Sequence, residues 1–125
     1  MMKNYYVEMA NGIKDSDVRR VAAAMSVHVG EANAIRIEQL SDEAGISERQ
    51  VRFILEQLVT DYGWAIGAHS SIPGRWIIAN EEERWHVANE LLRREEALRK
   101  RRRIIEQIKL PAKLEFEENP QQALF

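Results

Sequence analysis

The chain contains no cysteine among its 125 residues, which excludes disulfide bonds, zinc fingers, thiolate clusters and cysteine nucleophiles. No apolar run approaches the ~18 residues that span a bilayer, so we expect no membrane segment. The first residues, Met-Met-Lys-Asn-Tyr-Tyr, lack a basic region followed by an apolar stretch, so we expect no signal peptide. These absences predict a soluble, intracellular protein.

The usual motifs of catalysis are also missing. The sequence has no Gly-rich phosphate loop, no Gly-x-Ser-x-Gly elbow and no pair of acidic residues at a metal-binding spacing. The three histidines, His28, His69 and His86, have no metal-ligand spacing. We therefore expect no enzyme, no cofactor and no metal site.

Charge is nearly balanced overall but is unevenly distributed. There are 18 basic and 20 acidic residues, for a formal net charge of −2, which rules out a globally basic binder. Within residues 81–110, Glu81 to Glu83 come first and five basic residues follow at 99–103. This order suits the dipole of one long helix. The basic run is either a solvated helix face or a phosphate-contacting patch, and spacing alone does not decide between them.

Apolar periodicity predicts the first helix and a short strand. Asp15 or Ser16 is a suitable N-cap, apolar residues recur at helical spacing to Val29, and Gly30 is a natural stop. Residues 1–14 are assigned only as an N-terminal arm. Residues 34–37 alternate as a short strand does.

The most informative stretch begins at Ile37. A short helix ends at Gly45, Ile46 fills the corner, and Ser47 caps a second helix. The second helix carries one apolar stripe, formed by Val51, Ile54, Leu55, Leu58 and Tyr62. Two helices joined by a short Gly-containing turn form a helix-turn-helix.

A hairpin and a long helix are predicted next. Residues 64–68 and 75–79 read as strands around a loop with Pro73-Gly74, and residues 34–37 would complete a three-stranded sheet. Asn80 and Glu83 resemble a capping box that opens a helix to about Leu110. We expect Trp64, Trp76 and Trp85 in the core. The fold class is thus mainly α with minor α+β character: a winged helix-turn-helix over 15–79, a charged helix over 80–110 and a disordered tail over 111–125.

The segment from Ile37 to Ala79 resembles winged helix-turn-helix domains, most closely the small ones of phage and prophage genomes. The matching residues are Leu40, Ala44-Gly45-Ile46-Ser47, Arg49, Val51, Tyr62-Gly63, Ile66 and Gly74-Arg75-Trp76-Ile77-Ile78-Ala79. The resemblance implies a protein that binds double-stranded DNA in the cytoplasm of a bacterial host cell.

In such domains the second helix enters the major groove. Arginine can bridge guanine O6 and N7, and glutamine can pair with adenine. The expected DNA contacts are Ser47, Arg49, Gln50, Arg52 and Phe53 on this helix, Arg75 in the wing, and Arg101 and Arg102 on the last helix. The alternative is that these residues only form surface pairs, since Glu48 with Arg52 and Arg52 with Glu56 lie at i,i+4.

The last five residues resemble the Gln-x-x-Leu-Phe motif with which proteins bind the bacterial replication sliding clamp. Gln121, Leu124 and Phe125 match it, whereas Gln122 and Ala123 depart from the common choices. The resemblance implies a replication accessory or modulator that tethers to the clamp through its tail. The alternatives are a transcriptional regulator that dimerises through the last helix and binds an operator, and an adaptor that binds only protein.

Overall fold

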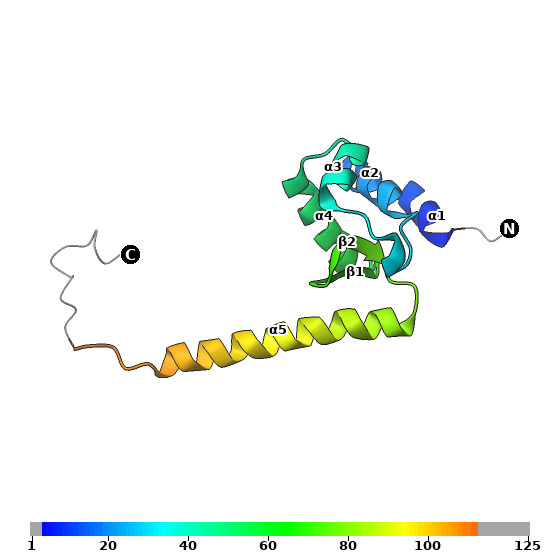
Figure 1. Cartoon of the computed structure of the whole chain (residues 1–125). Coiled ribbons are helices and arrows are strands. Elements are labelled where there is room, and N and C mark those ends of the chain that lie inside the picture. Colours follow the sequence, from blue (N-terminus) through cyan, green and yellow to red (C-terminus); the bar gives the residue numbers. More distant parts are fainter. Residues whose placement is uncertain (1–3, 113–125) are drawn as a thin grey trace. The chain divides into compact units, whose positions relative to one another are not determined.

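The computed structural model describes residues 4–112 (Figure 1). This part of the chain is mainly helical with one small antiparallel hairpin, which confirms the predicted mainly-α class. Its elements are α1 (Tyr5–Asn11), α2 (Ser16–Met25), the 3-10 helix η1 (Glu31–Asn33), α3 (Ile37–Ala44), α4 (Glu48–Thr60), β1 (Ile66–His69), β2 (Ile72–Ile77) and α5 (Glu81–Gln107). The chain divides into two units, Met1–Leu91 and Leu92–Phe125, and α5 contributes residues to both.

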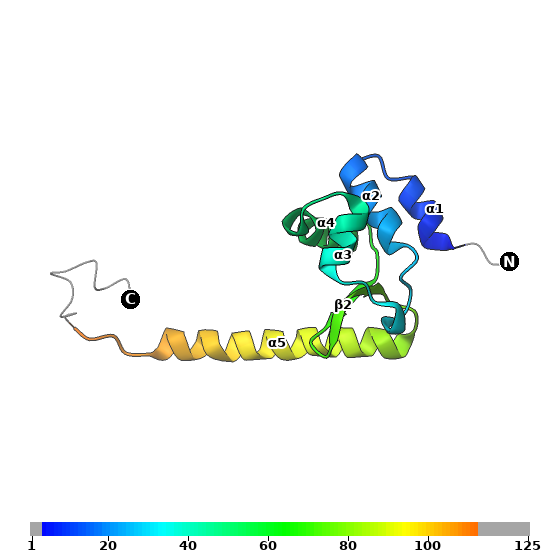
Figure 2. The same cartoon turned by 45° about the horizontal axis from the view of Figure 1, so that its top comes forward.

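The segment expected only as an N-terminal arm contains α1, which packs against α2 (Figures 1 and 2). Asn4 caps α1 by accepting from the Tyr6 backbone N–H at 2.9 Å, and its side-chain amide donates to the Ser26 carbonyl at 2.8 Å. Ala10 and Ile13 are buried. The packed part of the chain therefore begins before residue 15, where the domain was predicted to start, because Ala10 and Ile13 contribute to the core.

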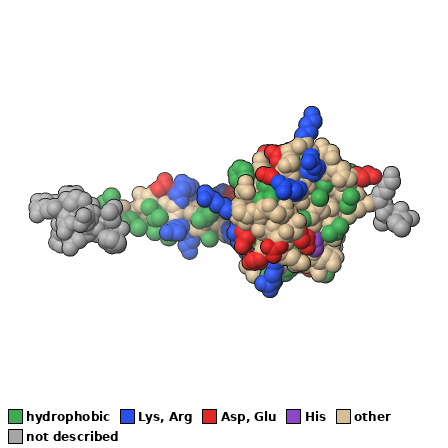
Figure 3. Space-filling model, turned by 90° about the horizontal axis from the view of Figure 1, so that it is seen from above, with side chains coloured by type: hydrophobic (Ala, Val, Ile, Leu, Met, Phe, Trp, Pro, Cys, Tyr) green, Lys and Arg blue, Asp and Glu red, His purple; other side chains and the backbone are tan. Residues whose placement is uncertain are grey.

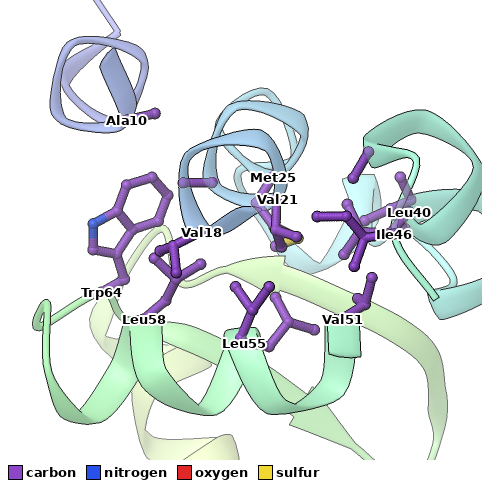
Figure 4. Packing of buried hydrophobic residues seen from close by; sticks show 14 of the residues in the cluster. Ala10, Val18, Val21, Met25, Leu40, Ile46, Val51, Leu55, Leu58 and Trp64 are labelled. Carbon is purple, nitrogen blue, oxygen red and sulfur yellow. The ribbon is translucent and has the colours of Figure 1, made fainter. Parts of the chain in front are cut away.

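The core lies between α2, α3 and α4. Asp15 caps α2 as predicted, since its Oδ1 accepts from the backbone N–H groups of the next turn. Figure 4 shows the apolar side of α2 meeting that of α4. α2 ends at Met25, earlier than expected, because the following residues become extended and bond to β2: His28 accepts from the Ile77 N–H and Gly30 donates to its carbonyl, both at 2.8 Å.

The predicted turn between two helices is present. α3 ends at Ala44, and the residue that caps it, Gly45, has a φ of +68°, a left-handed conformation that glycine adopts without strain. Ile46 is buried in the corner, and Ser47 is the N-cap of α4. The predicted apolar stripe of α4 is buried except at Tyr62, which follows the helix and is exposed.

The sheet has two strands rather than the predicted three. Residue Ile35 forms a single bridge to Arg75, with both backbone hydrogen bonds at 2.8 Å. It cannot extend into a strand because α3 begins two residues later. The hairpin turn is also tighter than expected: His69 pairs with Ile72, so only Ser70 and Ser71 lie between the strands.

α5 begins where the Asn80–Glu83 pair predicted. The Glu83 N–H donates to Asn80 Oδ1 at 2.9 Å, while the buried Glu83 carboxylate accepts from the backbone N–H groups of Ala79 at 2.9 Å and Glu31 at 3.1 Å. This carboxylate therefore joins the start of α5 to η1. Two of the three tryptophans expected in the core are buried, whereas Trp85 is 62% exposed. None of the helices within residues 4–112 has the length and apolar character needed to cross a membrane.

Candidate nucleic-acid interface

The exposed side of α4 begins directly after the turn. Ser47 Oγ accepts a hydrogen bond from the Gln50 backbone N–H at 3.3 Å, which makes capping its structural role. Buried side chains at every third or fourth position hold the other side of α4 against the core. The predicted contact residues on this helix consequently point outward, and all are exposed: Ser47, Arg49, Gln50, Arg52 and Phe53.

The two arginines of α4 are only weakly engaged with acidic neighbours. Arg52 Nη2 lies 3.9 Å from Glu48 Oε1, and both side chains are about half exposed. A pair this long and this exposed contributes little, so Arg52 can leave it for another anion. Arg49 forms no ion pair with any residue in 4–112. The surface-pair interpretation therefore accounts for one arginine and not for the other.

Acidic groups limit which part of α4 suits an anionic partner. A shallow depression of about 230 Å³ separates the start of α2 from α4, and Asp15 and Asp17 line it together with Gln50 and Phe53. Arg49 and Arg52 do not line this depression. The side of α4 that turns away from α2 therefore offers the positive charge, while the side with Gln50 and Phe53 faces carboxylates.

Arg75 lies within β2 and not in the hairpin turn. Its side chain is half-buried, and its guanidinium donates to the Gly74 carbonyl at 3.1 Å. Its backbone pairs with Ile35. The predicted phosphate contact would have to be made by the N–H groups of this guanidinium that do not bond to Gly74.

Sequence reasoning missed a contact that holds the hairpin turn. Glu90 of α5 accepts from the Ser70 backbone N–H with both carboxylate oxygens, each at 3.1 Å, and its Oε2 lies 3.2 Å from His69 Nε2. His69 Nδ1 accepts from the Ser71 N–H at 3.2 Å. The ring proton of neutral His69 is therefore on Nε2, where it can be donated to Glu90. Glu90 is 20 residues from Ser70 in the sequence, and no local spacing pattern relates two residues that far apart.

Arg101 and Arg102 belong to the second unit, so the structure does not join them to the α4 residues in one site. Arg102 Nη1 lies 2.9 Å from Glu106 Oε1. Arg101 is exposed. Figure 3 shows Lys and Arg side chains interspersed with apolar ones along α5.

The clamp-motif residues Gln121, Leu124 and Phe125 lie outside the described residues, as does the predicted tail from residue 113 onward. Within residues 4–112, no group of three or more His, Asp or Glu side chains could hold a metal ion. Comparisons with models of protein families, with curated proteins and with solved structures find no match for the chain. The functional argument therefore depends on the chain's own residues.

Proposed function

We propose that this chain is a phage-type winged-helix protein that binds double-stranded DNA, with α4 as its recognition helix. The observation that carries the proposal is the exposure of Arg49 and Arg52 in the first turns of α4, directly after the three-residue turn from α3. A helix presented in this way can enter the major groove with its N-terminal turns. The hairpin of β1 and β2 is then the wing.

Each predicted contact residue at the start of α4 has a role in this proposal. Arg49 and Arg52 contact guanine edges or phosphates, since a guanidinium can donate two parallel hydrogen bonds. Gln50 would read adenine and Phe53 would contact a thymine methyl or a sugar at the edge of the interface, because both also line the depression with Asp15 and Asp17. Ser47 fixes where α4 begins and so sets the depth at which these side chains reach the bases.

A second part of the proposal concerns the tail. The resemblance of residues 121–125 to the clamp-binding motif supports attachment to the bacterial sliding clamp. A domain on DNA and a peptide on the clamp would strengthen each other by raising the effective concentration of the second contact. This arrangement fits a replication accessory protein.

One observation favours an alternative, an adaptor that binds only protein. Residues 1–91 contain nine Lys and Arg against fourteen Asp and Glu, so the unit that carries α4 is acidic. Net negative charge disfavours approach to a polyphosphate. Salt dependence separates the two functions, because a DNA complex weakens steeply with salt.

The test compares two double variants in fluorescence anisotropy titrations of labelled duplex DNA. R49A with R52A removes the α4 arginines, whereas K14A with R84A removes the same charge from exposed positions outside α4. We expect the first pair to weaken binding at least ~10-fold, since one good arginine–base contact is worth about 1–3 kcal/mol. The control should lose less than about threefold. Equal affinities for the two double variants would refute α4 as the recognition helix.

A further inference from the structure

We infer that the α5 residues of the second unit, 92–107, form a separate surface for the phosphate backbone of duplex DNA, without sequence preference. This surface goes beyond the proposed α4 interface and does not depend on it. Arg93, Lys100 and Arg103 are its contact residues. They differ from Arg101 and Arg102, the pair that the sequence alone singled out.

The first argument is the partition of charge along the chain. Residues 92–112 contain eight Lys and Arg against three Glu, the reverse of the balance in residues 1–91. All residues from 92 to 112 are exposed. An excess of positive charge on one exposed helical segment attracts a polyanion such as DNA. The first unit, which contains α4, carries a net negative charge and does not attract DNA in this way.

The second argument is that the basic side chains of this segment are not equivalent. Arg99 is 3.3 Å from Glu95, and Arg102 is 2.9 Å from Glu106, each within the helix. Arg93, Lys100, Arg101 and Arg103 have no ion pair with any residue in 4–112. These four cations can contact an external anion without leaving a carboxylate.

The third argument is geometry. Seven residues make nearly two helical turns, so Arg93 and Lys100 share a direction, and Arg103 is one turn beyond Lys100 on the same side. Lys100 and Arg103 line a shallow depression of about 390 Å³ together with Glu96, Arg99, Ile104 and Gln107. Ten residues of helix span about 15 Å, which covers the axial rise of roughly four phosphates of one DNA strand.

The distribution of apolar residues favours DNA over an anionic lipid surface. Leu98 and Ile105 are exposed and lie seven residues apart on one side of the helix, whereas the exposed Leu92 and Ile104 point in other directions. A helix that lies in a lipid headgroup layer needs one continuous apolar face. Arg101 and Arg102 lie on either side of Leu98 and Ile105 and interrupt this apolar strip, whereas Arg93, Lys100 and Arg103 lie on the opposite side of the helix.

The experiment uses the full chain and a labelled duplex of random sequence, titrated at several salt concentrations. K100A with R103A is compared with R99A with R102A, which removes the same charge from the same segment and leaves a helix-favouring residue at each position. We expect the first pair to weaken binding roughly 10- to 100-fold at ~0.1 M salt. It should also reduce the slope of log affinity against log salt by about 1.8, the value for two phosphate contacts.

The control pair should weaken binding several-fold less, because Arg99 and Arg102 must each leave a weak, exposed ion pair with Glu95 or Glu106 before they can contact a phosphate. Equal losses of affinity in the two pairs would mean that only the net charge of the segment matters. An unchanged affinity in both pairs would mean that the segment does not contact the phosphate backbone. Either result overturns the inference. Stronger binding to anionic phospholipid vesicles, with displacement of the duplex, would also overturn it. The α4 proposal is judged separately, by comparing R49A with R52A against K14A with R84A.

Discussion

Glu83 offers the sharpest test of how the first unit is held together. Its carboxylate is 8% exposed and accepts from two backbone N–H groups, those of Ala79 and Glu31, which lie 48 residues apart. Replacement by glutamine keeps the size of the side chain but supplies only one acceptor oxygen. At least one backbone N–H then loses its partner in a partly buried position.

The expected cost follows from that lost acceptor. An unpaired buried donor destabilises a protein by about 1–3 kcal/mol, so we expect Glu83→Gln to lower the free energy of unfolding by about 2 kcal/mol. For a domain of this size that corresponds to a fall in Tm of roughly 8–16 °C. Because Trp64 and Trp76 are buried, tryptophan fluorescence during urea and thermal unfolding reports the transition of this unit.

Glu82→Gln is the matched control. Glu82 is exposed in the same first turn of α5, so its replacement changes the net charge and the interaction with the helix dipole by the same amount. We expect it to change the unfolding free energy by less than about 0.5 kcal/mol. If the two variants unfold at the same urea concentration, the link from α5 to η1 contributes nothing and the reasoning fails.

The remaining predictions concern the hairpin turn and the tail. Glu90→Gln weakens the acceptor of the Ser70 N–H, so we expect hydrogen exchange at that amide to accelerate about 3- to 10-fold. This acceleration corresponds to a hydrogen bond worth roughly 0.5–1.5 kcal/mol. An unchanged exchange rate would show that Glu90 does not hold the turn. Deletion of residues 121–125 should abolish binding to a bacterial sliding clamp in calorimetric titration while leaving affinity for duplex DNA intact. If the full-length chain does not bind the clamp in that titration, the clamp proposal is refuted.

The elements that sequence reasoning predicted well are those encoded by local pattern. Ser47 followed by a stripe of period 3.6 determined α4, and Asp15 and Asn80 marked the starts of α2 and α5. In each case the capping side chain and the apolar periodicity lie within a few residues of one another. Tertiary packing strengthens such a signal without altering it.

The elements that sequence reasoning missed depend on contacts between residues that are distant in the sequence. α1 has only seven residues, too few for a stable isolated helix, and it exists because Asn4 bonds to Ser26 and Ala10 is buried against the rest of the domain. The predicted strand at 34–37 is reduced to the bridge at Ile35 because Ile37 already belongs to α3. Glu90 illustrates the same limit in the candidate site, since no local spacing relates it to the hairpin turn.

The distribution of charge explains why discrimination and affinity would be located in different parts of this chain. At physiological salt the Debye length is ~8 Å, so the carboxylates around α4 repel only those phosphates that come close to them. A groove contact made by Arg49 and Arg52 is therefore feasible in an acidic unit, but it draws little help from long-range attraction. The segment 92–107 can supply that attraction because it is positive and exposed. Added salt should then weaken binding to random duplexes more than it weakens the preference of α4 for one sequence over another.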